Sequence, residues 1–346
     1  MFSLFRPFIF KLDPERAHNL AIKALKTNIL PSNQKHTFKS LNSSFLGKKI
    51  SNPIGLAAGF DKDAEVYNSM YKLGFGFVEV GTVTPKSQHG NPKPRMFRLE
   101  KDRAIINRLG FNNVGSEKII NRIKNNPPEG VLGINIGPNS NSENRINDYL
   151  ICLKTFHEVS DYITINISSP NTENLRNFHN KTELNELLKA LNDEKINLKT
   201  NVPLVIKISP DIENNQIDIT SDILLNSNIS AIIISNTSEK NRDNLISTNS
   251  VQKGGISGKP LEEKSNFLIK EFYKIFKGKI KIIGVGGVDS GKSAFQKFLS
   301  GANLIQLYTG MIYKGPNIAC KINSELNEIF KKEGIKNLSE IIGTKS

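Results

Sequence analysis

Eight short runs of apolar and β-branched residues alternate with helical patterns from residue 50 onward. Regular alternation of strands and helices is typical of a parallel sheet covered by helices, and eight units in a row favour a (β/α)8 TIM barrel. A doubly wound open sheet is the alternative, because strand order cannot be derived from spacing. The expected strands lie at 53–59, 76–82, 131–137, 162–168, 203–209, 230–236, 280–287 and 303–310.

The expected helices fall between and after these strands, and the chain length of 346 residues fits one such barrel. The segment 83–113 is then an insertion in the second strand-to-helix loop. We expect two parts, an N-terminal helical extension (1–40) and a barrel domain (41–346). The helices are predicted near 63–73, 114–125, 144–158, 182–197, 214–227, 261–277, 290–300 and 316–332.

The chain begins with the phenylalanine-rich stretch "MFSLFRPFIFKL". It has no signal-peptide cleavage site, and no window reaches the roughly 20 apolar residues of a membrane-spanning helix. Asp13, Pro14 and Glu15 form a helix-start pattern of cap, first-turn proline and acidic residue. We therefore expect two short amphipathic helices, whose apolar faces pack on the main domain or lie against a membrane surface.

The net charge of +14 raises the question of nucleic-acid binding. Lysine and asparagine are abundant throughout, however, and the basic residues form no stripe, so we expect no nucleic-acid partner. A diffuse positive field would still attract anionic substrates or anionic lipids. Cys152 and Cys320 fall in expected helices and indicate neither a disulfide framework nor a metal site.

Small or hydrogen-bonding residues stand at the end of every expected strand. In a barrel these ends meet at one rim, where the active sites of this fold lie. Glycine-rich segments follow the last strands ("GGISGKP", "GVGG", "YTG"), at the usual phosphate-binding position. The rim has no His, Asp and Glu cluster suited to a metal, and its asparagines suit a planar heterocycle such as a flavin or pyrimidine. These features favour redox chemistry by a flavin phosphate.

Eight motifs in order resemble those of class 2, quinone-linked dihydroorotate dehydrogenases of the bacterial type. They are "GLAAGFDKD", "GTVTP", "GNPKPRMFRL", "INRLGFNN", "NISSPNT", "GGISGKPL", "GVGG" and "YTG". The resemblance runs from "LDPERAHNLA" to residue 315 and includes the N-terminal extension. It implies oxidation of (S)-dihydroorotate to orotate in pyrimidine (UMP) biosynthesis, with hydride passing to FMN and electrons then passing to a membrane quinone.

The resemblance also implies site residues. One FMN per chain would be bound by Ala58, Gly59, Phe60, Asp61, Lys62, Thr82, Asn135, Asn166, Lys207, Ser235, Gly258, Gly287, Tyr308 and Thr309. Dihydroorotate would be bound by Lys62, Asn107, Arg108, Leu109, Gly110, Phe111, Asn166, Asn171, Asn236 and Thr237.

The resemblance makes Ser169 the base that removes the C5 proton, with Thr172 a candidate for passing the proton on. Its neighbour Ser168 has the same chemistry, but adjacent residues of an extended chain point to opposite sides. By the same resemblance, the N-terminal phenylalanines form the mouth of a quinone tunnel. The protein would then lie peripherally on the cytoplasmic face of the cell (inner) membrane, as a monomer.

One departure from the family pattern is a Glu173-Asn174 pair, where the family has Pro-Gly. Three other functions compete with this reading. A soluble dihydroorotate dehydrogenase using fumarate or NAD and a tRNA-dihydrouridine synthase would each require a cysteine at the rim. A non-catalytic basic scaffold would purify without colour.

Overall fold

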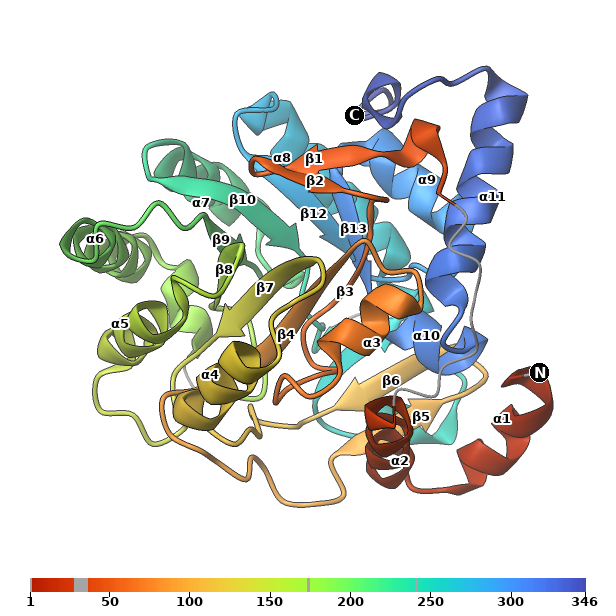
Figure 1. The fold of residues 1–346 in the computed structure, drawn as a ribbon, viewed down its shortest axis with the longest axis horizontal. Coiled ribbons are helices and arrows are strands. Elements are labelled where there is room, and N and C mark those ends of the chain that lie inside the picture. The colour runs from red at the N-terminus through yellow and green to blue at the C-terminus, as the bar shows by residue number, and fades with distance from the viewer. Residues whose placement is uncertain (1, 28–36, 173–174, 241) are drawn as a thin grey trace.

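The computed structural model describes residues 2–27, 37–172, 175–240 and 242–346. Its centre is a closed barrel of eight strands, each parallel to its neighbours, so the barrel expectation is confirmed and the open sheet is wrong (Figure 1). In barrel order the strands follow the chain, and the last pairs with the first. They are β3 (Ile54–Leu56), β4 (Phe77–Val83), β7 (Val131–Ile136), β8 (Tyr162–Asn166), β9 (Leu204–Lys207), β10 (Ile229–Ile234), β12 (Lys281–Val285) and β13 (Leu304–Leu307).

Helices surround this barrel and separate its strands along the chain (Figure 1). The eight expected helices are present, with ends that differ by a few residues from the predicted ones. They are α3 (Tyr67–Lys72), α4 (Ser116–Asn125), α5 (Arg145–Phe156), α6 (Lys181–Asn197), α7 (Asn214–Leu225), α8 (Glu262–Phe276), α9 (Gly291–Ser300) and α11 (Ile318–Glu333). A short helix, α10 (Thr309–Lys314), follows β13 directly.

A hairpin that the sequence patterns did not reveal closes the amino-terminal end of the barrel. Its strands are β1 (Ser43–Phe45) and β2 (Lys48–Ile50). Phe45 and Ile50 pack with the lowest layer of inward-facing side chains, among them Phe77 and Tyr162. The hairpin therefore lies at the opposite end from the rim where the strands terminate (Figure 1).

The insertion 83–113 also carries strands that were not predicted. β5 (Met96–Leu99) and β6 (Ala104–Asn107) form an antiparallel pair, and β11 (Gly255–Gly258) joins the other side of β6. The register places Asn107 opposite Gly255 and Ala104 opposite Gly258. This small sheet brings two loops that are far apart in the sequence together over the carboxyl ends of the barrel strands.

Both predicted N-terminal helices are present, as α1 (Phe2–Lys11) and α2 (Pro14–Lys26). The Asp13 side chain accepts hydrogen bonds from the backbone N–H groups of Glu15 and Arg16, as a helix cap does. The two helices lie beside β5 and α10, at the rim end of the barrel (Figure 1). Within the described ranges, no helix is long and apolar enough to cross a membrane.

Lys297 on α9 has a fully buried amino group that ties α9 to α8. Its Nζ donates to Ser265 Oγ and to Asn266 Oδ1, each at 2.9 Å. Ser265 Oγ in turn donates to the Val285 carbonyl at 2.6 Å, at the end of β12. Burial lowers the pKa of Lys297 from its ordinary value to about 7, although the Glu262 carboxylate acts in the opposite direction.

This burial predicts a pH dependence of stability that Lys297→Met removes. Between pH 7 and about 10 the unfolded chain keeps the lysine proton that the folded protein has lost, so unfolding becomes harder as pH rises. Relative to the variant, the wild-type free energy of unfolding should rise by at most about 1.4 kcal/mol per pH unit. Urea titrations of both proteins at several pH values measure this difference, and parallel pH profiles would contradict the prediction.

Candidate functional site

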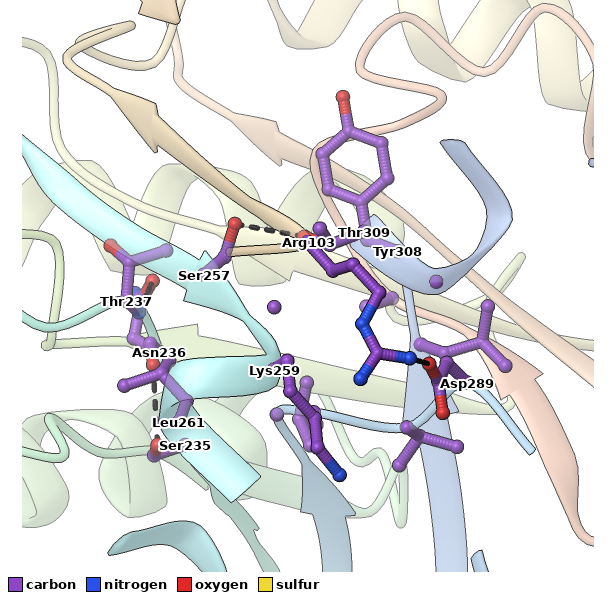
Figure 2. Close-up of a pocket in the computed structure, with 18 of the residues that line it drawn as sticks. Arg103, Ser235, Asn236, Thr237, Ser257, Lys259, Leu261, Asp289, Tyr308 and Thr309 are labelled. Carbon is purple, nitrogen blue, oxygen red and sulfur yellow. Dashed lines mark hydrogen bonds and ion pairs between the residues drawn. The ribbon is translucent and has the colours of Figure 1, made fainter. Parts of the chain in front are cut away.

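A cleft opens at the carboxyl ends of the barrel strands (Figure 2). Loops that follow β3, β10, β12 and β13 contribute to it, together with the end of β9 and with β6 and β11 of the small sheet. The predicted site residues that line it are Ala58, Asn107, Lys207, Ser235, Asn236, Thr237, Gly258, Gly287, Tyr308 and Thr309.

Glycines allow the backbone segments around this cleft to lie against one another. A β-carbon on Gly287 would lie 2.4 Å from the β-carbon of Glu262, and one on Gly310 would lie 2.3 Å from the Val288 carbonyl oxygen. Gly258 has φ +99°, a conformation that side chains disfavour. Backbone rather than side chains therefore forms much of this wall, as a phosphate group requires.

Lys207 ends β9 and presents a cation to the cleft. Lys207 is 5% exposed, and its Nζ makes no hydrogen bond to another residue that the structure describes. Burial lowers the pKa of this lysine, while the negative charge of Glu79 opposes the change. The ammonium group is thus available to an electron-rich ligand.

A buried carboxylate, Glu79, lies beneath the rim inside the barrel. It accepts hydrogen bonds from Asn135 Nδ2 at 2.8 Å and from Gln306 Nε2 at 2.9 Å. The hydroxyls of Tyr162 and Thr164 donate to it at 3.1 Å each. Because a carboxylate can only accept, it fixes the amide of Asn135 with Nδ2 toward Glu79 and Oδ1 toward the rim.

The fixed orientation of the Asn135 amide determines how Thr82 and Asn166 bond to it. Asn135 Oδ1 accepts from Thr82 Oγ1 at 2.6 Å and from Asn166 Nδ2 at 3.2 Å. Asn166 Oδ1 then faces Ser168 Oγ at 3.1 Å and Asn236 Nδ2 at 3.3 Å. The predicted residues Thr82, Asn135 and Asn166 thus form one directional network below the cleft, and Glu79, at its deepest point, was not among the predicted residues.

The two adjacent serines after β8 have different partners. Ser168 is fully buried, and its hydroxyl donates to Asn166 and accepts from Asn236 Nδ2 at 2.9 Å. Ser169 is 5% exposed, and its Oγ accepts from the backbone N–H of Asn171 at 3.2 Å. The Ser169 proton is therefore not committed to that contact. Thr172 is also buried, whereas Glu173 and Asn174 lie outside the described residues.

Other predicted residues lie around a second, smaller cavity between α2 and the barrel. It is lined by Phe60, Asp61, Lys62 and Leu109, with Glu15 and His18 from α2. Lys62 Nζ donates to the Gly59 carbonyl at 2.7 Å, and burial lowers its pKa to about 8. Burial raises the pKa of Asp61 to about 6, although two backbone N–H groups bind its carboxylate.

The remaining predicted substrate residues are dispersed along the insertion. Asn171 Nδ2 lies 3.3 Å from Asn107 Oδ1, which joins the loop after β8 to β6. Arg108 instead donates to the carbonyls of Pro94 and Lys253 and stacks over Phe97. The carbonyls of Gly110 and Phe111 accept from Gln88 Nε2 at 3.0 Å and 3.1 Å.

The cleft also contains residues that were not predicted. Arg103, in the turn between β5 and β6, reaches Asp289 across the cleft at 3.2 Å, and Ser257 Oγ accepts from Thr309 Oγ1 at 2.8 Å (Figure 2). Lys259 follows β11 and pairs with Glu262. Arg103 and Ser257 follow no barrel strand, so a search of strand ends could not find them.

Neither of the two cysteines lines the cleft. Cys152 is buried in α5, where burial raises the pKa of its thiol, and Cys320 lies on α11. Across the described ranges, no three His, Cys, Asp or Glu side chains group as metal ligands would.

Comparison with known proteins gives one consistent family. Residues 40–330 match the family model described as dihydroorotate dehydrogenase. The chain is 44% identical to "Dihydroorotate dehydrogenase (quinone)" of Idiomarina loihiensis, over 94% of this chain and 100% of that protein. It is 43% identical to the protein of the same name from Bartonella henselae, over 96% of this chain and 93% of that one.

Solved structures agree with the sequence relatives. The crystal structure of DHODH from Eimeria tenella in complex with ferulenol superposes with a TM-score of 0.92. That chain is 35% identical in sequence, and the match covers 96% of this chain and 95% of that one.

Proposed function

The chain belongs to the dihydroorotate dehydrogenase family, and we propose that its barrel rim binds FMN and dihydroorotate side by side. Its relatives are quinone-linked enzymes, so the reaction is the oxidation of dihydroorotate to orotate in pyrimidine biosynthesis, with a quinone as electron acceptor. The observation that carries the proposal for the site is the cleft itself. It combines a glycine-lined wall, the unbonded ammonium of Lys207 and a fixed set of neutral amides.

The residues present fit FMN as the flavin of this flavin-dependent enzyme. The closely packed backbone at Gly258, Gly287 and Gly310 suits the phosphate. Lys207 suits the electron-rich end of the ring system, and the Thr82, Asn135 and Asn166 network supplies oriented hydrogen-bonding groups beneath it. When bound, FMN accepts the hydride, which no side chain of this site could accept.

The substrate position that we propose lies between Asn107, Asn171 and Asn236. Asn107 and Asn236 line the cleft, and Asn171 contacts Asn107. Neutral amides offer both donors and acceptors to the ring amides of dihydroorotate. Lys62 supplies a cation for its carboxylate, with a pKa of about 8 that burial has lowered.

We assign the role of base to Ser169. Its hydroxyl is nearly excluded from water, and among the described residues its oxygen only accepts, from the Asn171 N–H, so no other group holds its proton. A serine hydroxyl is a weak base at neutral pH, so the water-restricted setting is part of the proposal. Ser168 is unsuited to this role because its hydroxyl is shared between Asn166 and Asn236.

The quinone, we propose, reaches the flavin along α2. His18 on α2 lies edge-on to Phe60 with ring centroids 5.1 Å apart, and Phe60 contacts Tyr308 of the cleft at 6.0 Å. The Tyr308 hydroxyl is buried with no hydrogen-bond partner among the described residues. This row of rings connects the N-terminal helices to the rim.

The same helices form the membrane contact that we propose for the extension 1–40. Leu4, Phe5 and Phe8 are 72%, 58% and 68% exposed, and α1 has no buried residue. Lys11 and Arg6 on the same helix suit anionic headgroups. An enzyme bound in this way would lie peripherally on the cytoplasmic face of the cell membrane.

Reduction of a short-chain quinone by dihydroorotate tests the proposed function, with fumarate and NAD as alternative acceptors. The purified protein should be yellow, should lose its flavin colour with dihydroorotate under anaerobic conditions, and should turn over with the quinone alone. A colourless protein, or turnover with fumarate or NAD instead, would refute the proposal.

A further inference from the structure

Arg176 connects the ends of three neighbouring barrel strands. It lies in the short helix η2 (Leu175–His179), in the loop after β8. Its Nε donates to the Ser168 carbonyl at 3.3 Å and its Nη2 donates to the Thr237 carbonyl at 3.2 Å. One guanidinium therefore binds the backbone beside the proposed base and the backbone of a predicted substrate residue.

The third strand end is reached through a carboxylate. Arg176 Nη1 lies 3.0 Å from Asp211 Oδ2, in the loop after β9, and 3.1 Å from Glu239 Oε2, in the loop after β10. The side chains of Arg176 and Asp211 are 24% and 9% exposed, whereas that of Glu239 is 52% exposed. The Asp211 contact is thus the more strongly desolvated of the two, and charge-assisted bonds in such a setting are stronger than surface ion pairs.

Asp211 is itself fixed by the loop after β10. It accepts from the Ser238 hydroxyl and from the backbone N–H of Glu239, the latter at 2.9 Å. The planar guanidinium has five N–H donors in a fixed fork, so it can bind two carbonyls and a carboxylate that lie on different sides of it. The three loops are consequently held in one arrangement by a single residue.

His179 provides a second anchor for η2. Burial lowers its pKa to about 4, so the ring is neutral at physiological pH. Its Nε2 accepts from the backbone N–H of Ser209 at 3.1 Å, which leaves Nδ1–H to donate to the Arg176 carbonyl at 3.0 Å. The backbone of Arg176 is therefore tied to the end of β9 independently of its side chain.

We propose that Arg176 is a positioning residue that holds the Ser169 segment against the Asn236-Thr237 segment in the geometry needed for proton removal. The proposal rests on the proposed function, because it takes Ser169 as the base and Asn236 and Thr237 as substrate contacts. Ser168, whose carbonyl Arg176 binds, also accepts a hydrogen bond from Asn236 through its hydroxyl. Loss of the guanidinium would let these two segments separate, and displacements of about 1 Å can cost about a hundredfold in rate.

Arg176→Gln tests this role with two readouts on the yellow enzyme. Anaerobic reduction of the bound flavin by dihydroorotate should slow by about 10- to 100-fold. The Kd for orotate, measured from its perturbation of the flavin spectrum, should rise about tenfold, while FMN content stays at the wild-type level. The reduction rate and the orotate Kd of Arg176→Lys should lie between those of the wild type and of Arg176→Gln. The lysine ammonium keeps the Asp211 contact but lacks the planar fork that reaches both carbonyls.

Asp211→Asn and a matched control complete the test. Arg176→Gln and Asp211→Asn should weaken orotate binding less than additively when combined, because they break one shared contact. Arg122→Gln removes a guanidinium on α4 that binds the Asp63 carbonyl and the Glu65 carboxylate, and it should change thermal stability but not the Kd for orotate. If Arg176→Gln does not fold, the Arg176→Lys and Asp211→Asn variants carry the test.

The proposal would be overturned if FMN-containing Arg176→Gln reduced its flavin and bound orotate like the wild type. If Arg176→Gln does not fold, the same result in Arg176→Lys and Asp211→Asn would overturn it. So would an equal loss of orotate affinity in Arg122→Gln. Failure of the wild-type flavin to be reduced by dihydroorotate would instead refute the proposed function, so the two failures are distinguishable.

Discussion

Ser169→Ala should remain yellow and bind orotate, yet reduce its flavin with dihydroorotate about 10²- to 10⁴-fold more slowly than the wild type. A general base typically contributes a factor of this size. Ser169 is 5% exposed and, among the described residues, its Oγ accepts one hydrogen bond, from the Asn171 backbone, so the truncation removes little packing. Anaerobic stopped-flow measurement of flavin reduction, with FMN content and the orotate Kd measured on the same sample, checks this prediction.

Ser168→Ala is the matched control, one residue away on the same strand end. Its hydroxyl links Asn166 to Asn236, so its loss should weaken orotate binding while slowing flavin reduction far less than Ser169→Ala does. Unchanged flavin reduction in Ser169→Ala would refute the assignment of the base. A larger rate loss in Ser168→Ala than in Ser169→Ala would reverse the two roles.

The barrel could be predicted from the sequence because its signal is local and repeated. Each buried strand is an apolar run, and each covering helix carries its own periodicity, so eight units could be counted without tertiary information. Strand closure was inferred from the number of units alone, and the pairing of β13 with β3 confirms it. The hairpin β1–β2 was missed because its two strands of three residues each are too short to show alternation.

The small sheet over the cleft escaped prediction for a different reason. β11 lies about 150 residues after its partner β6, and the pairing of Asn107 with Gly255 depends on the closed barrel bringing both loops to one end. Arg103 owes its place in the cleft to this sheet and not to any motif. Its contact with Asp289 is therefore a consequence of tertiary structure.

Within the candidate site, too, residues with a local sequence signal could be predicted, and residues that depend on tertiary contacts could not. Asn135, Asn166 and Lys207 could be identified because each is the last or the last but one residue of a barrel strand. Glu79 lies four residues before the end of β4, where a charged residue in the fully buried run "FVEVGTV" was the available signal. Its role depends on partners from three other strands, which only the closed barrel brings within hydrogen-bond distance.

The predicted N-terminal extension has a separable role that removal of residues 1–40 should reveal. We expect quinone-dependent turnover to fall about tenfold or more, because the row of rings that we propose as the quinone path begins at His18. Flavin reduction by dihydroorotate should fall much less than quinone turnover, since Ser169, Lys207 and the Glu79 network make no hydrogen bond to α1 or α2 among the described residues, and α2 forms only part of the wall around Lys62. Steady-state quinone assays and stopped-flow reduction of the same preparation measure the two steps separately.

A milder variant separates membrane contact from quinone access. Combined substitution of Leu4, Phe5 and Phe8 by serine changes only side chains that are 58% exposed or more, so the contacts of Phe10 with Tyr313 and of His18 with Phe60 remain. This variant should bind anionic vesicles more weakly than the wild type while turning over a water-soluble quinone at the wild-type rate. Quinone turnover that survives removal of residues 1–40 would show that the acceptor reaches the flavin by another route, because the deletion removes both His18 and the apolar face of α1.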